Sequence, residues 1–529
     1  MSAIYTFIVI VLGILAVAGL FVGVTNDAVN FLNSAIGSKA APKKIILLVA
    51  SIGIIIGAVT SSGMMEVARN GVFDPGLFSY EDIMILFLGM MLSNIILLDI
   101  YNSLGLPTST TVALVFSLLG AAIAVSLYKI SNDAALSLSS LGGFINTTRA
   151  MGVISAILLS VIIAFVFGTL VMWISRFIFS FRYLNIFRRW GALWCGASFT
   201  AIAYFAVFKA LKGVLSGTAM YTWISDNLLL ALFICWLVCT VVLFFLQMFR
   251  VNILRINILL GTFALALAFA GNDLVNFIGV PYAGYDSYML AQASSEPITS
   301  MAALSNPTKA NFLIMCAAGL VMVITLFMSK KAMRVIETER KLSSQSEEAP
   351  TNSEATVMSR GIVRAVRMFN DFITRLTPKS VIEAIDSRFE PLPEDERGDV
   401  NYDLIRATVN LTAAAILISI GTQLKLPLST TYVVFMVSMG SSLADRAWGR
   451  ESAVYRITGV MTVIMGWFVT AVGGFLIALG VTLALVYGGT IAIVAVTVLC
   501  VFLIIRSNLK SNKSVEEEEE ELPTAKIVD

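Results

Sequence analysis

Long apolar stretches follow one another along most of the chain, separated by short polar segments. Many of them reach the ~20 residues that a helix needs to cross the hydrocarbon core of a bilayer. The pattern predicts about twelve crossings, because some stretches can be re-entrant hairpins. The sequence therefore predicts an all-α polytopic membrane protein. Its candidate spans cover residues 4–24, 44–63, 82–102, 107–128, 150–178, 190–212, 225–249, 254–277, 311–329, 403–422, 427–446, 456–486 and 488–506.

The same polar motif interrupts two of these apolar stretches. Residues 26–31 and residues 272–277 both read Asn-Asp-x-Val-Asn-Phe. A carboxylate inside a membrane-length segment is costly and is usually kept for a functional site. We interpret the two copies as breaks in two membrane helices. The polar members of the motif are Asn26, Asp27, Asn30, Asn272, Asp273 and Asn276.

A second motif is also duplicated. Residues 104–111 and 424–431 share the pattern Leu-x-Leu-Pro-x-Ser-Thr-Thr, and an apolar stretch follows each copy. Ser109 lies 82 positions after Asp27, whereas Ser429 lies 156 positions after Asp273. The excess of 74 positions matches the hydrophilic segment 330–402, which is 73 residues long. The two motifs therefore belong to one internal repeat, and its second copy carries an insert.

The order of the motifs divides the chain into two repeats of opposite orientation, because seven candidate spans separate their starts. Inverted repeats with broken helices near the bilayer midplane are typical of secondary transporters. We expect a first membrane repeat at 1–180 and connecting transmembrane helices at 181–253. The second repeat is expected at 254–329 and 403–506, with a cytoplasmic hydrophilic insert at 330–402 and a cytoplasmic acidic tail at 507–529.

Composition excludes several classes of function. The 529 residues are 58% hydrophobic and 13% charged, and none is histidine. The lack of histidine removes His-based catalytic triads and the usual proton shuttle. A net charge of +2 gives no reason to expect a nucleic-acid partner. We therefore expect a multi-pass protein of the cell membrane, in a bacterium the cytoplasmic (inner) membrane, surrounded by the lipid bilayer, with no cofactor and no enzymatic activity.

The Pro-x-Ser-Thr-Thr motif has the chemistry of an anion site. Proline is well tolerated in the first turn of a helix, so Pro107 and Pro427 are predicted to begin helices. The first turn presents unpaired backbone N–H groups and the positive end of the helix dipole, which together bind anions. Two such ends in inverted halves suit a compact oxyanion. Its predicted ligands are Ser109, Thr110, Thr111, Ser429, Thr430 and Thr431.

The Asn-Asp motif has the opposite preference. Asp27 and Asp273 need a cation, a proton or hydrogen-bond donors around them. With amide oxygens and unwound backbone carbonyls beside them, they suit a hard cation such as Na⁺, and a protonatable aspartate can instead couple H⁺. We expect these residues to couple transport to the cation. Asp99 lies outside the symmetric set, and the sequence leaves open an extra cation or a packing hydrogen bond for it.

Together, the motifs resemble the PiT inorganic phosphate transporters across the membrane portion of the chain. The resemblance implies inverted repeats, uptake of inorganic phosphate coupled to Na⁺ or H⁺, and a homodimer. It assigns phosphate to the two Ser-Thr-Thr copies, and cation coupling to Asp27, Asn30, Asp273 and Asn276. The family commonly has histidine after Ser-Thr-Thr, where this chain has Val112 and Tyr432. That departure favours Na⁺.

Two alternatives remain beside phosphate symport. One is a symporter of sulfate or a related oxyanion, which the missing histidines leave open. The other belongs to a different class, an intramembrane enzyme in which Asp27 and Asp273 form an acid–base pair. The symmetric placement of the two aspartates in Asn-rich motifs, each followed by a Ser-Thr-Thr motif, fits ion binding better.

Overall fold

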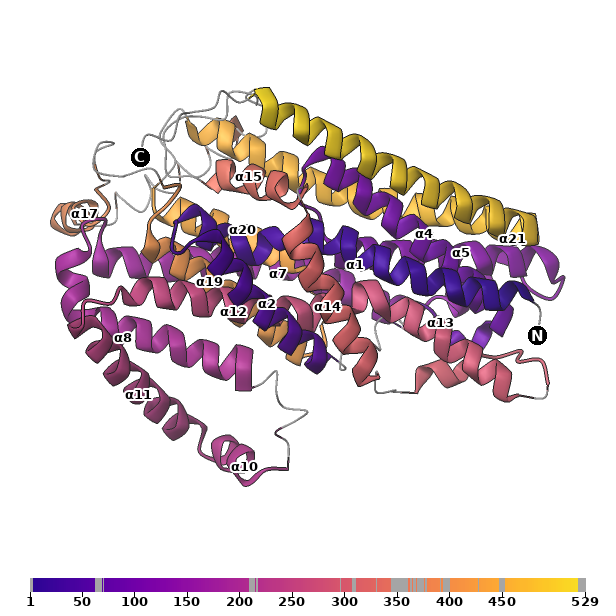
Figure 1. Cartoon of the computed structure of the whole chain (residues 1–529), viewed down its shortest axis with the longest axis horizontal. Coiled ribbons are helices and arrows are strands. Elements are labelled where there is room, and N and C mark those ends of the chain that lie inside the picture. Colours follow the sequence, from indigo (N-terminus) through magenta and orange to yellow (C-terminus); the bar gives the residue numbers. More distant parts are fainter. Residues whose placement is uncertain are drawn as a thin grey trace.

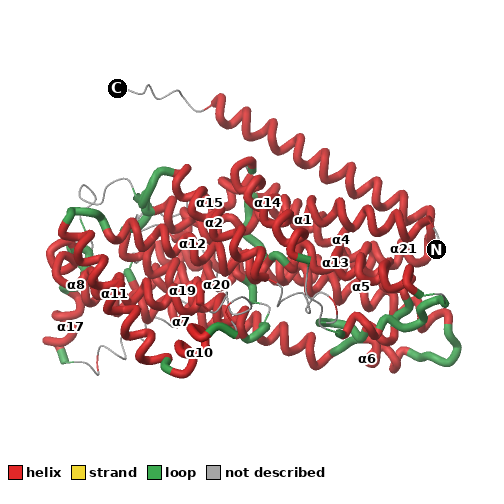
Figure 2. Tube along the Cα trace, turned by 60° about the horizontal axis from the view of Figure 1, so that its bottom comes forward, coloured by secondary structure: helices red, strands yellow, loops and turns green. Residues whose placement is uncertain are grey.

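The computed structural model describes residues 3–61, 69, 71–208, 215, 217–294, 296–306, 311–329, 331–343, 360–361, 364, 368, 375, 378–390, 392, 400–426, 428–446 and 452–521. Every named element within them is a helix, and loops join the helices (Figure 2). Most of the predicted insert and the last part of the predicted tail lie outside the described residues.

Ten described helices are long and apolar enough to cross a membrane, and two shorter apolar helices accompany them. This confirms the predicted all-α polytopic class. Large apolar side chains on the periphery remain uncovered, such as Leu229, which is 83% exposed, and Phe249, which is 78% exposed. Apolar surface on this scale requires an apolar surrounding. The protein is therefore a multi-pass membrane protein.

The first repeat consists of five long helices in chain order. They are α1 (Ala3–Gly37), α2 (Lys43–Thr60), α4 (Tyr80–Leu104), α5 (Thr110–Asn132) and α7 (Thr147–Phe179). Short elements connect them: η2 (Pro75–Leu77), η3 (Leu138–Ser140) and α6 (Leu141–Phe144). We call α4, the tip at residues 105–109 and α5 the first hairpin.

The second repeat follows the same order. Helices α12 (Ile253–Asp273) and α13 (Val275–Ala293) correspond to α1, α14 (Phe312–Met328) to α2, α19 (Leu404–Gln423) to α4, α20 (Thr430–Ala444) to α5, and α21 (Ser452–Glu521) to α7. We call α19, its tip and α20 the second hairpin. The remaining described elements are η5 (Ala302–Ser305), α15 (Lys331–Ser343) and α17 (Lys379–Asp386).

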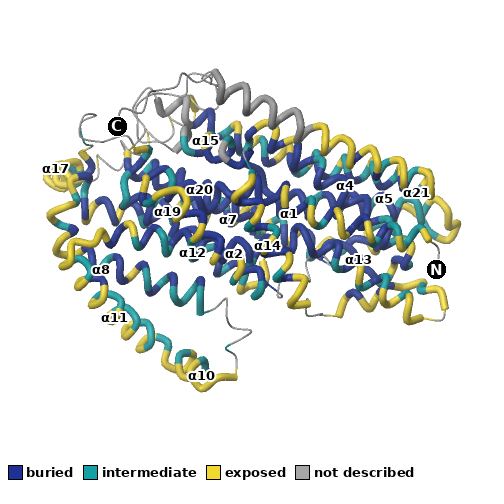
Figure 3. Tube along the Cα trace, viewed as in Figure 1, coloured by how far each residue is buried: buried dark blue, intermediate teal, exposed yellow. Residues whose placement is uncertain are grey.

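Among the described residues, four connecting elements lie between the repeats, namely α8 (Leu184–Ile202), the π-helix η4 (Ala203–Phe208), α10 (Ala219–Asp226) and α11 (Leu228–Met248). In Figure 3, α10 and α11 are largely exposed at the periphery, whereas α1 and α20 are largely buried in the middle. The connecting helices therefore do not form the centre of the molecule.

Helices of one repeat pack on helices of the other. The first hairpin lies along α21 and the second hairpin lies along α7, while α2 packs on α12 and α14 packs on α1. Figure 1 shows α4, α5 and α21 in one half of the molecule, and α19, α20 and α7 in the other. The tips of the two hairpins consequently meet near the middle, where α1 and α12 also pass.

Glycines at equivalent positions allow these contacts. A Cβ on Gly120 of α5 would lie 2.3 Å from the Phe475 carbonyl oxygen of α21, and a Cβ on Gly440 of α20 would lie 2.3 Å from the Phe165 carbonyl oxygen of α7. Both distances are far below van der Waals contact. The two hairpins therefore use the same close helix crossing, each against the last helix of the other repeat.

The predicted helix break at the Asn-Asp motif was wrong for α1. Helix α1 stays helical through its Asn-Asp motif, and α12 passes into α13 at Leu274, whose φ of −56° and ψ of −36° are helical. Unwinding would expose backbone groups that only other protein groups can satisfy in a membrane. The predicted separation of spans 456–486 and 488–506 agrees with the structure, because the two helical parts of α21 meet at Gly489, where φ is 58° and ψ is −148° and the backbone is not helical.

Candidate functional site

The tip of the first hairpin reverses the chain at Gly105. Its φ of 65° lies in the left-handed region, and the amide of Leu106 donates to the carbonyl of Tyr101 over 3.1 Å. Helix α5 begins at Thr110, and the Ser109 hydroxyl caps it by accepting from the amide of Val112 over 3.1 Å. The chain therefore enters α5 with both threonines in the first turn.

The second hairpin repeats this geometry 320 positions later. Lys425 occupies the left-handed position with a φ of 54°, and the amide of Leu426 donates to the carbonyl of Gly421 over 3.0 Å. The hydroxyl of Ser429 caps α20 by accepting from the amide of Tyr432 over 3.1 Å. The same turn thus forms without glycine in this copy.

Pro107 does not begin α5, contrary to prediction. Pro107 precedes the Ser109 cap, so it lies outside α5, and Pro427 is outside the described residues. The two serines, predicted as anion ligands, cap the helices with their hydroxyl oxygens. Pro107 fixes the backbone before the cap, and the serine cap satisfies one of the otherwise unpaired first-turn amides.

Asp27 accepts hydrogen bonds from threonine hydroxyl groups of both hairpins. Thr110 of the first hairpin donates to Oδ2 over 2.9 Å, and Thr431 of the second donates to Oδ1 over 3.2 Å. Asp27 is fully buried. This carboxylate therefore joins the first turns of two helices that belong to different repeats.

Asp273 repeats the arrangement with the partners exchanged. Thr430 of the second hairpin donates to its Oδ2 over 2.6 Å, and Thr111 of the first hairpin donates to its Oδ1 over 2.9 Å. Each aspartate thus binds the first threonine of its own repeat and the second threonine of the other. The site has the two-fold pseudosymmetry that inverted repeats produce.

The motif asparagines cross between the repeats. The Nδ2 of Asn30 lies 3.3 Å from the Thr430 hydroxyl and 3.2 Å from the Thr431 hydroxyl. The Nδ2 of Asn276 lies 3.2 Å from the Thr110 hydroxyl and 3.0 Å from the Thr111 hydroxyl. The buried Oδ1 of Asn30 has no hydrogen-bond partner among the described residues. It is an acceptor oxygen in reach of the same cluster.

The other two asparagines hold the hairpin tips. Asn26 donates to Oδ1 of Asn102 over 2.8 Å and accepts from the amide of Thr108 over 2.9 Å. At the equivalent place, Asn272 accepts from the hydroxyl of Thr422 over 3.3 Å and donates to a carbonyl of the second tip over 2.9 Å. Asn26 and Asn272 therefore position the tips.

The structure brings all twelve predicted residues into one buried cluster, in which none is more than 2% exposed. They do not form separate cation and anion sets, because threonine hydroxyls donate directly to the aspartates. Sequence reasoning missed Asn102 and Thr422, which lie 320 positions apart, as do the paired prolines. That shared offset was a signal that could have identified them.

The partners of the two carboxylates set the chemistry of the cluster. Each bond that the structure gives them comes from a hydroxyl or an amide. Two buried negative charges beside hydroxyl and amide oxygens form a ligand set that suits a hard cation. The first turns of α5 and α20 add backbone N–H groups and positive dipole ends, which suit an anion. One cluster therefore offers groups for both kinds of ion.

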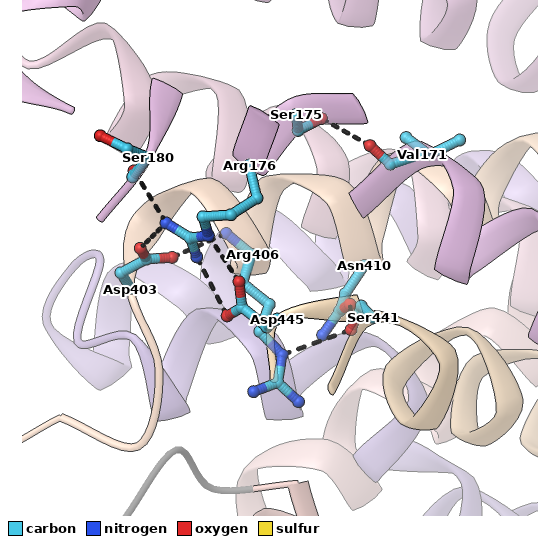
Figure 4. A network of polar contacts seen from close by, with 9 residues as sticks. All are labelled: Val171, Ser175, Arg176, Ser180, Asp403, Arg406, Asn410, Ser441 and Asp445. Carbon is cyan, nitrogen blue, oxygen red and sulfur yellow. Dashed lines mark hydrogen bonds and ion pairs between the residues drawn. The ribbon is translucent and has the colours of Figure 1, made fainter. Parts of the chain in front are cut away.

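A buried ion network fixes the end of the second hairpin remote from this site (Figure 4). Arg176 of α7 bonds Asp445 at the end of α20, over 2.5 Å from Nε and 3.0 Å from Nη2, and bonds Asp403 at the start of α19 over 2.8 Å. Beside it, Arg406 donates to the Ser441 hydroxyl over 3.3 Å. At the first hairpin, Lys129 pairs with Asp82 over 2.7 Å. Both hairpins are thus fixed by charges at their outer ends.

The fold and the site define a class of protein: a multi-pass membrane protein whose two repeats enclose one buried polar site. The chain belongs to the phosphate transporter family, whose model matches residues 23–342. This confirms the resemblance seen in the motifs. A family of transporters also argues against the alternative of an intramembrane aspartyl enzyme.

Relatives share part of the chain. A Pyrococcus horikoshii protein named "Putative phosphate permease PH0640" is 27% identical over 192 residues, which are 36% of this chain and 44% of that protein. A Bacillus subtilis protein named "Probable low-affinity inorganic phosphate transporter" is 29% identical over 170 residues, 32% of this chain and 46% of that protein. The chain thus matches less than half the length of these relatives.

A solved structure shares the fold. The structure titled "The sodium-dependent phosphate transporter" has a TM-score of 0.65 with this chain and is 15% identical in sequence. The match covers 90% of this chain and 98% of that one. The arrangement of helices described above is therefore a known transporter architecture.

Proposed function

We propose that the protein is a secondary transporter that carries inorganic phosphate across the membrane together with Na⁺. The observation that carries this proposal is the shared cluster, in which two buried aspartates meet the first turns of two opposed helices. Family membership and the names of the relatives support phosphate as the substrate.

The aspartates favour phosphate over sulfate. At neutral pH inorganic phosphate keeps at least one P–OH group, whereas sulfate keeps no proton. A buried carboxylate accepts a hydrogen bond from P–OH, but it repels a fully ionised oxyanion. Asp27 and Asp273 therefore supply acceptors that only a protonated oxyanion uses, while the threonine hydroxyls and first-turn amides donate to its remaining oxygens. Sulfate is the weaker candidate for this reason.

Cation coupling follows from charge. Two buried carboxylates and a phosphate anion together need positive charge, because isolated buried charge is strongly unfavourable. Asp27, Asp273 and the amide oxygen of Asn30 supply hard oxygen ligands for Na⁺ close to the anion. Binding of the cation thus makes binding of the anion favourable, which couples the two gradients. The name of the solved structure with the same fold agrees with Na⁺ as the coupling ion.

Access to the site is proposed to alternate through the hairpin tips. The Thr111 hydroxyl oxygen lies 3.2 Å from the Leu428 carbonyl oxygen, so the start of α5 touches the second tip. Each hairpin is held at its outer end by charges and packs along one helix of the other repeat. Rocking one hairpin and its partner helix against the other opens one side of the site while the other stays closed.

Uptake into proteoliposomes tests the proposal. Labelled phosphate should accumulate when an inward Na⁺ gradient is imposed at equal pH on both sides, and excess sulfate should compete poorly. Asp273→Asn should abolish this accumulation, and Asp226→Asn, on an exposed connecting helix, should retain it. Uptake that follows a pH gradient and ignores Na⁺ would refute sodium coupling. Absence of phosphate uptake under both gradients would refute the function.

The predicted homodimer remains a prediction, which native mass spectrometry can check.

A further inference from the structure

Helix α15 is a polar helix that begins the insert and lies outside the membrane spans. It packs on α1 and also contacts α4 of the first hairpin. Lys331 pairs with Asp99 of α4 over 3.2 Å, and the Thr338 hydroxyl donates to the Gly105 carbonyl over 3.0 Å. The Asp99 that the sequence left open thus pairs with the insert. Through these bonds α15 holds the tip that leads into the first pair of site threonines, Thr110 and Thr111 of α5.

The inner face of α15 contains a carboxyl group with almost no exposure. Glu339 is 1% exposed, and the Nδ2 of Asn33 donates to its Oε1 over 2.8 Å. Asn33 belongs to α1, six residues after Asp27, and it is 2% exposed. Its equivalent in the second repeat, by the spacing of the Asn-Asp motifs, is Gly279. This contact is therefore not part of the symmetric transport site.

The amide of Asn33 has an unused acceptor. Its buried Oδ1 has no hydrogen-bond partner among the described residues, although the Nδ2 of the same amide already bonds the carboxyl group. A carboxylate cannot donate to Oδ1, whereas a protonated carboxylic acid can. An acid and a primary amide then form a ring of two hydrogen bonds, which satisfies both groups. Leaving a buried acceptor unpaired is unfavourable.

We propose that Glu339 and Asn33 form a proton-binding site, and that neutral Glu339 holds α15 against α1 and the tip of the first hairpin. One proton from water on the insert side binds a Glu339 carboxylate oxygen, and no other bond is made or broken except the hydrogen bond to Asn33. Deprotonation leaves a buried negative charge, so α15 then loosens. That this loosening alters transport rests on the proposed function, but the proton site does not.

The surroundings of Glu339 agree with a titratable group. Burial raises the pKa of the Glu339 carboxyl to about 7 from its usual 4.5, and the hydrogen bond from Asn33 opposes that rise. The charges of Glu339, Arg340 and Arg406 all act on the buried hydroxyl of Tyr402. The ionisable groups on α15 and on the elements packed against it include Asp27, Asp99, Tyr101, Lys331, Arg334, Glu337, Arg340, Tyr402, Arg406, Tyr432, Asp445 and Arg506.

The sign of the pH dependence follows from the raised pKa. Glu339 binds a proton more tightly when α15 is docked against α1 than when α15 is released. Docking of α15 is therefore strongest below 4.5, the usual pKa of a glutamate carboxyl. Docking then weakens about tenfold per pH unit as the pH rises towards the docked pKa, and stays constant above it. Mild acid should therefore close α15 onto the hairpin tip, and mild alkali should release it.

Two measurements on the full-length protein in lipid nanodiscs test this site. Infrared difference spectra between about pH 5 and about pH 8 should contain the carbonyl band of a protonated carboxylic acid. Glu339→Gln should remove that band. Glu337→Gln, at an exposed carboxyl group two residues earlier on the same helix, should retain it. A spectrum in which Glu339→Gln leaves the titrating band unchanged would overturn the proposal.

Hydrogen–deuterium exchange of residues 331–343 tests the clamp. After correction for the intrinsic pH dependence of exchange, protection of wild-type α15 should fall as the pH rises over the same range. Glu339→Gln mimics the neutral acid and should stay protected at the alkaline end. Equal loss of protection in wild type and Glu339→Gln would refute the clamp. Neither readout needs transport, so a failure of phosphate uptake would refute the proposed function and leave this test intact.

Discussion

Replacing Asp273 by asparagine tests whether one carboxylate serves both ions. The substitution keeps the shape of the side chain, removes its charge and turns one acceptor oxygen into a donor. Thr111 and Asn276 both donate to Oδ1, over 2.9 Å and 2.7 Å, so the amide oxygen should occupy that place. The new NH₂ group then faces Thr430, whose hydroxyl donates to Oδ2 over 2.6 Å.

The expected magnitude follows from the bonds that change. A hydrogen bond to a charged group contributes ~1.5–3 kcal/mol, so the loss of one such bond to P–OH should weaken phosphate binding roughly 10- to 150-fold. Loss of the charge should also remove the dependence of binding on Na⁺. Stability should change little, because a buried carboxylate without a cation is itself unfavourable.

Calorimetric titration of phosphate at high and low Na⁺ measures both effects. By the pseudosymmetry of the site, Asp27→Asn should behave like Asp273→Asn. Thermal unfolding of each variant separates lost binding from lost folding. Phosphate affinity within twofold of wild type, with its Na⁺ dependence intact, would refute the assignment of Asp273 to both ions.

Three further predictions concern the scaffold, and thermal unfolding of the purified protein checks each. Residues 105 and 425 both have left-handed backbone, which favours glycine. Gly105→Ala should therefore destabilise the protein by about 1 kcal/mol, and Lys425→Gly should stabilise it by a similar amount. A change in stability of the same sign for both variants would contradict this. Arg176→Met should cost ~3–5 kcal/mol, since it leaves two aspartates without their partner. An unchanged midpoint would contradict that role. Gly120→Val and Gly440→Val should each cost more than ~1 kcal/mol by forcing helices apart, and a large difference between them would argue against equivalent crossings.

Much of the site could be predicted from sequence because polar residues are rare in membrane spans. Asp27 and Asp273 stand out against apolar surroundings, and their shared motif makes them a pair. The common offset of the Ser-Thr-Thr copies likewise predicts two equivalent helix starts. These inferences need only short patterns and the cost of burying polar groups, so they hold without knowledge of any contact.

Local geometry was less predictable. The Asn-Asp motif was expected to break its helices, but α1 continues through it because side-chain partners satisfy the polar groups and the backbone keeps its own bonds. Pro107 was expected inside α5, yet Ser109 caps that helix and places the proline before it. A sequence pattern identifies that a turn is present more readily than it fixes which residue begins the next helix.

Composition and recurrence are properties of the chain, so the class of protein, the two repeats and the residues predicted for the site could be inferred without coordinates. The pairing of Thr111 with Asp273, and of Glu339 with Asn33, became visible only in the folded protein. Each hairpin packs on a helix of the other repeat, and this packing places each threonine pair beside the aspartate of the other repeat. Contacts between residues far apart in the sequence depend on how the helices cross, and a local sequence pattern does not predict that crossing.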